Sequence, residues 1–268
     1  MKKLAIAVGA IAIAATAGWL WLDHQDEYGS LGASASRLLH IDTNPLPDFQ
    51  QYSDVRAKKL AFFGYLQPIV EANNQRITQD RGRIREIQAR VPQTTLRTNM
   101  AATDRRFLDS LVARYEVDPK LAPAQQIAAL LDRVDTVPIS LALTQAALES
   151  AWGTSRFAKE GNNLFGQWCY QQGCGIVPQH RGSHQKHEVA RFASVDAAVS
   201  SYMRNINSHP AYTGLRSARA TLRQSGQSVT GHDMAEHLLR YSQRGSAYVE
   251  ELQSMIRVNK LAALDHSA

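Results

Sequence analysis

The chain has 268 residues, of which 44% are hydrophobic and 20% are charged, and its formal net charge is +6. This composition suits one globular domain with additional segments and excludes a collagen-like or wholly disordered chain. The basic balance favours an anionic partner such as cell wall, lipid head groups or nucleic acid. Because no block of basic residues is interleaved with aromatic residues, we expect no nucleic-acid binding.

An apolar stretch opens the chain. Two lysines precede residues 4–22, which carry no charged side chain. At about 1.5 Å per residue, a helix of this length roughly spans a bilayer core. The positive charges before it place the N-terminus inside and the rest of the chain outside. Residues 15–17 read Ala-Thr-Ala, which also suits signal-peptide cleavage. We expect residues 1–22 to be a membrane anchor or a signal peptide.

A linker and a helical extension follow. Residues 23–50 contain glycines, serines and prolines and are typical of a linker. The pattern of residues 51–114 is helical, and Pro68 should kink or split its first helix. A narrow apolar stripe on the charged second half fits a coiled-coil or partner-binding helix, or a helix packed on its own domain. Its members are Ile77, Ile84, Ile87 and Val91.

The next prominent segment is an apolar helix expected from Pro138 to Trp152. Proline suits the first turn, and Gly153 suits the end. Because nearly every side of this helix is apolar, it should be buried in the core. Glu149 stands in its last turn, where the helix dipole disfavours a carboxylate. Burial and the dipole should both raise the pKa of Glu149.

Glu149 is therefore a candidate general acid. A carboxylic acid that stays protonated near neutral pH can protonate the leaving oxygen of a glycosidic bond. The alternative is a Glu149 that points to solvent at the helix end or pairs with Arg156. Gln145 lies one turn earlier on the same stripe, where it could hydrogen-bond a sugar or orient the acid.

Two motifs around this glutamate carry a resemblance. Residues 149–155 read Glu-Ser-Ala-Trp-Gly-Thr-Ser, and residues 162–166 read Asn-Asn-Leu-Phe-Gly. Together they resemble the glucosaminidase domain family, glycoside hydrolase family 73. Residues 201–202 and 209–212 are also similar to that family, as are Tyr241 and Tyr248. The similarity covers roughly residues 115–262, and the whole chain resembles the Bax group of proteins in Gram-negative bacteria.

The resemblance implies an α+β, mainly α fold: a lysozyme-like domain with a small β-lobe over the cleft. It implies hydrolysis of the β-1,4 bond between N-acetylglucosamine and N-acetylmuramic acid in peptidoglycan, by a periplasmic monomer without a cofactor. Glu149 maps onto the family's catalytic acid, and Tyr212 onto a tyrosine that lines the cleft near the acid. Tyr241 and Tyr248 map onto a motif whose aromatic side chains help to shape the site.

A second carboxylate is harder to find, although most glycosidases use two. Glu188 is the only carboxylate between Glu160 and Asp196. It lies in a short predicted strand, from which it could act as a general base. The alternative is that Glu188 is a solvent-facing charge on a basic hairpin. In that case the acetamido group of the substrate could act as internal nucleophile, with Tyr212 nearby.

The two cysteines, Cys169 and Cys174, enclose four residues. In an oxidising compartment they would form a disulfide, and loop-closure entropy gives about 2 kcal/mol for so short a loop. A metal site with His180 or His184 is the alternative, but the second ordered ligand pair of a zinc site is missing. We predict a disulfide and no metal site.

Aromatic residues near the motif could stack on sugar faces. Trp168 and Phe165 are the candidates for the floor of a subsite, and core packing is the alternative for each. For Trp152 and Phe165 we favour core packing, and for Trp168 both interpretations stay open. Asn162 and Asn163 should cap and turn the backbone rather than contact the substrate.

Two rival functions remain. A lytic transglycosylase also uses a single glutamate on a lysozyme-like fold, but that family usually continues from Glu-Ser into a Gly-Leu-Met-Gln motif, which is absent here. A non-catalytic wall-binding scaffold protein would explain both the weak second carboxylate and the long N-terminal helix.

Overall fold

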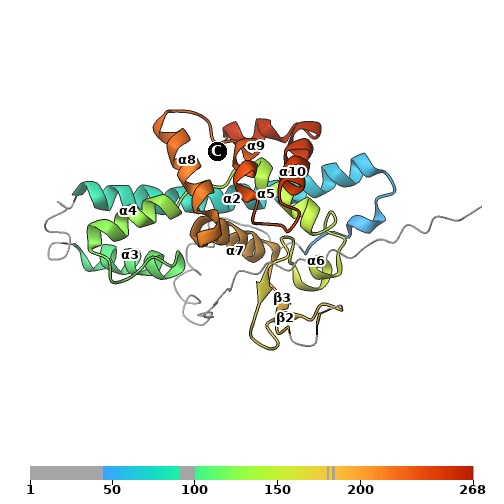
Figure 1. Ribbon diagram of the computed structural model, residues 1–268, viewed down its shortest axis with the longest axis horizontal. Helices are drawn as coiled ribbons and strands as arrows, with labels where there is room; N and C mark the ends of the chain where they lie inside the picture. Colours follow the sequence, from blue (N-terminus) through green and yellow to red (C-terminus); the bar gives the residue numbers. More distant parts are fainter. Residues whose placement is uncertain (1–44, 91–99, 180, 183–184, 268) are drawn as a thin grey trace, which may run out of the picture.

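The computed structural model describes residues 45–90, 100–179, 181–182 and 185–267, and it is mainly helical with one small sheet (Figure 1). The α-helices are α2 (Val55–Arg90), α3 (Ala102–Arg114), α4 (Pro123–Arg133), α5 (Ile139–Glu149), α6 (Arg156–Gly161), α7 (Val195–Ser208), α8 (Thr213–Gln224), α9 (Gly231–Ala235) and α10 (Ser246–Val258). The 3-10 helices are η1 (Phe49–Gln51), η2 (Pro210–Tyr212), η3 (Glu236–Leu238) and η4 (Leu261–Ser267). The strands are β1 (Trp168–Cys169), β2 (Gly175–Ile176) and β3 (Glu188–Ala190). The predicted α+β, mainly α class is confirmed.

Helix α5 forms the centre of the core. Every residue from Ile139 to Ala147 is buried, and α2, α9, α10 and η4 all pack against this helix. The prediction of a buried central helix is confirmed. The helix ends at Glu149, three residues earlier than expected, because the backbone turns left-handed at Ala151.

Helix α2 crosses the molecule as one continuous helix (Figure 1). The prediction that Pro68 splits it is wrong, because Leu66, Ile69 and Val70 are buried on either side of the proline and tertiary packing maintains the helix. Ile84 and Ile87 are fully buried against the chain's own domain, so the coiled-coil interpretation of the stripe is wrong as well. Val91 lies outside the described residues.

Polar contacts tie α2 to the rest of the core. The Asn74 side chain donates to the Val137 carbonyl (2.8 Å) and accepts from the Val137 amide (3.0 Å), just before α5. Asn73 and Arg76 both bind Asp196 at the start of α7. Residues 51–90 therefore share a core with the predicted glucosaminidase domain, whose boundary at residue 115 stays a prediction.

The three strands form an antiparallel sheet in the order β1-β3-β2. Cys169 and Cys174 form a disulfide across the β1–β2 turn, as predicted. The buried Asn163 donates to the carbonyls of Gln167 and Ala190, so it holds the loop after α6 against β3. Asn162 adopts a left-handed conformation at the end of α6. The expected capping and turning roles of both asparagines are confirmed.

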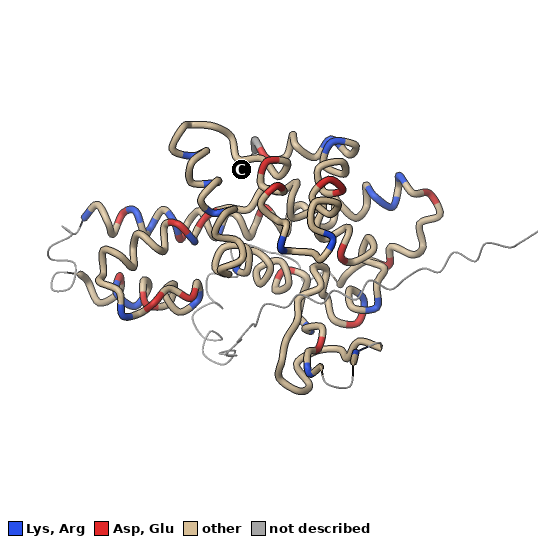
Figure 2. The backbone as a smooth tube through the Cα atoms, viewed as in Figure 1, with Lys and Arg blue, Asp and Glu red and all other residues tan. Residues whose placement is uncertain are grey.

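Charged residues of both signs are distributed over several helices rather than gathered on one (Figure 2). Within the described ranges, no helix is long and apolar enough to cross a membrane. The predicted anchor or signal segment, residues 1–22, lies outside the described residues, as does most of the predicted linker.

One carboxylate near the C-terminus fixes the start of α5. Asp265 accepts hydrogen bonds from the amide (2.9 Å) and hydroxyl (2.6 Å) of Ser140 and from the amide of Gly231 (2.8 Å) at the start of α9. A Cβ atom at Gly231 would lie 2.1 Å from the Ser140 hydroxyl oxygen. The two helix starts are therefore packed tightly together, and one side chain caps both.

Replacing Asp265 with alanine should lower the free energy of unfolding by about 2–3 kcal/mol, because two helix caps and a hydroxyl partner are lost together. Urea unfolding followed by circular dichroism measures the change. The matched control is Asp54→Ala, which removes one exposed cap from the amide of Ala57 and should cost about 1 kcal/mol or less. Equal losses for the two variants would contradict the shared role of Asp265.

Candidate functional site

Glu149 is the last residue of α5, and an unusual turn follows it. Ala151, Trp152 and Gly153 have φ values of 50°, 61° and 74°, so three consecutive residues are left-handed. This conformation costs roughly 1–2 kcal/mol for each residue that has a Cβ atom. The Trp152 amide donates to the Ala147 carbonyl (2.8 Å), and the Gly153 amide donates to the Ser150 hydroxyl (2.7 Å). These bonds end the helix directly behind Glu149.

Aromatic residues of η1 and α2 pack against this turn. The Trp152 ring lies edge-on to Phe62 and Phe63, with centroid separations of 5.7 and 5.3 Å. A Cβ atom at Gly153 would lie 2.7 Å from a ring carbon of Phe49. Core packing of Trp152 is confirmed. The sequence shows an apolar cluster at Phe62 and Phe63, but no pattern connects that cluster to the glutamate motif.

The Glu149 carboxyl group is half-buried, and burial raises its pKa to about 7. The Tyr248 hydroxyl donates to Glu149 Oε1 at 2.9 Å and opposes this rise. Arg156 pairs instead with Glu160 at 3.1 Å, so the predicted alternative of a Glu149–Arg156 pair is wrong. The expected rise in the pKa of Glu149 is present, with burial as its largest cause.

Tyrosines enclose one side of this carboxyl group. Tyr241 stacks on Tyr248 at 5.6 Å with an interplanar angle of 3°, and Tyr212 lies 6.2 Å from Tyr241. The Tyr241 hydroxyl donates to the Phe165 carbonyl, which connects the tyrosines to the second motif. Burial and the charge of Glu149 raise the pKa of Tyr212 well above its usual value. The structure therefore brings Glu149 and the three candidate tyrosines together.

Gln145 is fully buried behind this group. Its amide donates to the Tyr248 hydroxyl at 3.0 Å and accepts from the Tyr202 hydroxyl at 2.6 Å. With both ends of the amide occupied inside the core, the geometry favours the interpretation that Gln145 orients the acid rather than binding a sugar. In the sequence, Tyr202 stands out only as part of the stretch 201–202 that is similar to the family. Its role depends on a contact with Gln145, 57 residues away in the sequence.

Glu188 is buried, with 4% of its surface exposed, so the prediction that it faces solvent is wrong. Its two carboxylate oxygens accept from the amides of Gly173 (3.0 Å) and Gly175 (2.8 Å), beside the disulfide. These backbone hydrogen bonds lower the pKa of Glu188. Both oxygens are occupied by the hairpin, which favours a role in holding the loop over the predicted role as a general base.

Replacing Glu188 with glutamine should therefore destabilise the protein by about 1–3 kcal/mol, because an amide group would face one of the two backbone donors. Since the folded-state pKa of Glu188 is lowered, the carboxylate stabilises the fold above its unfolded pKa of about 4.3. That stability is lost as pH falls through the lower folded value. Unfolding of the two proteins from pH 3 to pH 7 should show a gap that closes at acidic pH.

The matched control for Glu188 is the exposed Glu250, for which glutamine should change stability by at most about 0.5 kcal/mol. Turnover of folded Glu188→Gln separates the two roles of this residue. Near wild-type turnover supports the loop-holding role, and a large fall in kcat at full folding would contradict it.

The two stacking candidates differ in exposure. Phe165 is 2% exposed and stacks on Tyr202 at 4.0 Å, so it packs in the core, as favoured from the sequence. Trp168 is half-buried and stacks on His187 at 4.0 Å with an interplanar angle of 13°. This pair gives the sheet an aromatic surface that a sugar ring could contact.

The predicted alternative of a metal site is not supported. Cys169, Cys174 and Glu188 lie close together, but the two sulfur atoms are joined and the carboxylate is occupied by backbone amides. His180 and His184 lie outside the described residues.

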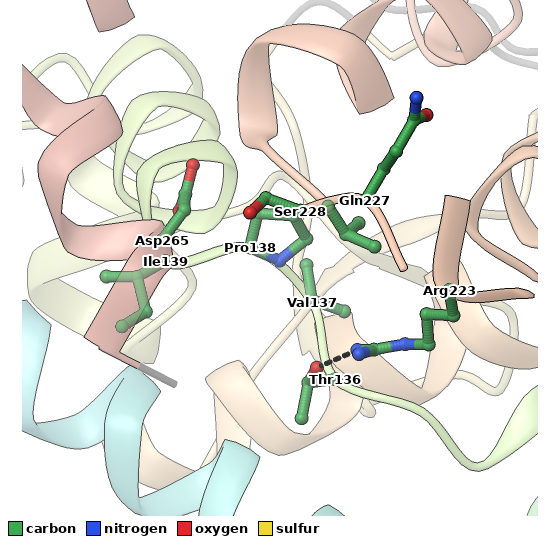
Figure 3. Close-up of a pocket in the computed structure, with 9 residues that line it drawn as sticks. Thr136, Val137, Pro138, Ile139, Arg223, Gln227, Ser228 and Asp265 are labelled. Atoms are coloured by element: carbon green, nitrogen blue, oxygen red, sulfur yellow. Dashed lines mark hydrogen bonds between the residues drawn. The ribbon is translucent and has the colours of Figure 1, made fainter. Parts of the chain in front are cut away.

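A polar pocket between Arg223 and Asp265 lies at the opposite end of α5 from Glu149 (Figure 3).

Comparison with known proteins places the site in a family context. The profile of the glucosaminidase family, described as mannosyl-glycoprotein endo-beta-N-acetylglucosaminidase, matches residues 122–261. Protein bax of Escherichia coli (strain K12) is 32% identical over 228 residues, which cover 84% of this chain and 78% of that protein. No solved structure matches the chain significantly. The matched range contains Glu149 and the tyrosines around it.

Proposed function

The chain belongs to the glucosaminidase family, and from this membership we propose that it is an endo-β-N-acetylglucosaminidase acting on peptidoglycan. The proposed reaction is hydrolysis of the β-1,4 bond between N-acetylglucosamine and N-acetylmuramic acid. One observation carries the proposal: Glu149 is a half-buried carboxyl group whose pKa of about 7 keeps much of it protonated at neutral pH. It has the acidity that a general acid requires.

In the proposed mechanism, Glu149 gives its proton to the glycosidic oxygen as the bond to the anomeric carbon breaks. The tyrosines on one side of Glu149 limit access of water to the carboxyl group. Because both oxygens of Glu188 are bound to backbone amides, we favour the acetamido group of the substrate as the internal nucleophile, with Tyr212 near the reacting atoms. Water then attacks the anomeric carbon of the oxazolinium ion, which restores the acetamido group, and its proton returns to the Glu149 carboxylate. Trp168 would contact a sugar face, and the tyrosine pair Tyr241 and Tyr248 would shape the cleft.

We place the protein in the cell envelope, on the outer side of the inner membrane. The support is the apolar N-terminal segment of the sequence and the disulfide, which suits an oxidising compartment. A lysozyme-like arrangement of the cleft and a monomeric state are part of the same proposal.

Mass spectrometry of the fragments released from purified peptidoglycan tests the reaction. The proposal predicts fragments with reducing N-acetylglucosamine ends. Anhydro-muramoyl ends would identify a lytic transglycosylase instead. Binding to peptidoglycan without the release of fragments would identify a wall-binding scaffold protein.

A further inference from the structure

We propose that a one-way chain of hydrogen bonds determines which oxygen of Glu149 carries the acidic proton. The chain, called the relay below, runs from Tyr202 through Gln145 and Tyr248 to Glu149 Oε1. It leaves Oε2 as the oxygen that holds the proton and faces Gly166. The inference rests on the proposed role of Glu149 as the general acid and makes Gln145 and Tyr202 positioning residues.

The orientation of the Gln145 amide is the first step. Tyr202 lies 2.6 Å from Oε1 of this amide, a length typical of an O–H···O hydrogen bond. The opposite end, Nε2, lies 3.0 Å from the Tyr248 oxygen, a length typical of N–H···O. Gln145 is 0% exposed, so solvent does not compete for either end. The amide therefore donates towards Tyr248 and accepts from Tyr202.

The direction of the Tyr248 hydroxyl follows. Its oxygen accepts from Gln145, so its single hydrogen is free for Glu149 Oε1, 2.9 Å away. The ring is 2% exposed and stacks on Tyr241, which is itself anchored to the Phe165 carbonyl. Since the ring is buried and stacked on Tyr241, the hydroxyl stays in place and donates to Glu149.

The position of the acidic proton is the last step. Glu149 Oε1 already accepts from Tyr248, so the neutral carboxyl group carries its hydrogen on Oε2. A Cβ atom at Gly166, whose φ is 64°, would lie 3.6 Å from Oε2. Because glycine has no side chain, no Cβ atom at this position lies against Oε2. The proposal places the glycosidic oxygen at Oε2, the carboxyl oxygen next to Gly166.

The groups that act on Glu149 come from several elements. On α10 and the segment before it, Arg244 pairs with Glu251 at 2.6 Å; Arg244 lowers the pKa of Glu149, and Glu251 raises it. The Tyr248 hydrogen bond is the largest influence that opposes burial. The titratable and charged groups around Glu149 are Tyr202 on α7, Tyr212 on η2, Tyr241 and Arg244 before α10, and Tyr248 and Glu251 on α10.

The test measures the pKa of Glu149 directly, by NMR of the carboxyl carbons in the full chain. The Glu149 signal is identified by its absence from the spectrum of Glu149→Gln. Tyr248→Phe should raise this pKa by about one unit, since a hydrogen bond to the charged form is lost. Tyr202→Phe should raise the pKa of Glu149 less. Without Tyr202 the Gln145 amide can turn, and its hydrogen bond to Tyr248 weakens. The double variant should match Tyr248→Phe alone, because Tyr202 acts only through Tyr248.

The matched control is Tyr115→Phe, a buried tyrosine at the end of α3, which should leave the pKa of Glu149 unchanged. If Tyr202→Phe does not fold, Gln145→Met removes the amide that donates to Tyr248 and should shift the pKa of Glu149 in the same direction. An unchanged pKa in the single variants, or additive shifts in the double variant, would overturn the relay.

A second readout separates the relay from the proposed function. The pH at which kcat falls on the alkaline side should rise in step with the measured pKa, because a general acid is lost when it ionises. If the NMR shifts occur while Glu149→Gln keeps full activity, the relay holds and the proposed function fails. If Glu149→Gln is inactive and the NMR shifts are absent, the proposed function holds and the relay fails.

Discussion

Replacing Glu149 with glutamine should reduce turnover on peptidoglycan by about 10²–10⁴-fold, because proton donation to the leaving oxygen contributes a factor of this size. KM should change little, since the amide occupies nearly the same volume and Tyr248 can still donate to its oxygen. Initial rates of fragment release at pH 6, with binding to insoluble peptidoglycan measured in parallel, give the two quantities.

The same substitution has a signature in pH dependence. In the wild type, kcat should fall as pH rises through about 7, where Glu149 loses its proton. The raised pKa also means that the ionised carboxylate destabilises the fold above pH 7, so Glu149→Gln should be the more stable protein there. The control is Glu160→Gln, an exposed carboxylate paired with Arg156, which should keep both turnover and its pH dependence. A Glu149→Gln variant with wild-type turnover would contradict the role of this residue as the acid.

Replacing Trp152 should have the next largest effect. Trp152→Ala removes the contacts with Phe62 and Phe63 and should cost about 2–4 kcal/mol of stability. The turn behind Glu149 loosens at the same time, so kcat should fall by about tenfold to a hundredfold. Thermal or urea unfolding and initial rates measure the two effects.

The matched variant Trp152→Gly separates packing from backbone strain. Glycine removes one more carbon than alanine, but it adopts the left-handed conformation at φ 61° without steric cost. Trp152→Gly should therefore be more stable than Trp152→Ala by about 1 kcal/mol. The opposite order would show that the left-handed turn is not strained at this position.

The sequence predicts those parts of the site that depend on local pattern. A carboxylate at the end of an apolar helix made Glu149 a candidate acid, and the motif around it strengthened that prediction. The disulfide followed from the spacing of Cys169 and Cys174. The small sheet and the candidate tyrosines followed from a resemblance rather than from physical reasoning. The α+β, mainly α class followed from the same resemblance, whereas the burial of α5 is predicted by its run of residues that is apolar on nearly every side.

The remaining features depend on contacts between distant segments. The continuity of α2 through Pro68 depends on tertiary packing, which no local rule includes. The role of Glu188 depends on two backbone amides of a neighbouring hairpin, and the orientation of Gln145 on Tyr202. A single sequence gives residue types and spacing, but it does not give the hydrogen-bond partner of a buried polar group.

The two ends of α5, the helix that carries the acid, contact segments that lie far apart in the sequence. Aromatic residues of α2 pack against the turn at its end, and Asp265, 125 residues beyond Ser140, caps its start. Contacts at such separations form late, because the loops between them must close first. A chain that emerges N-terminus first cannot complete the start of α5 until Asp265 has emerged. The helix that carries the acid is therefore capped at its start only late in folding.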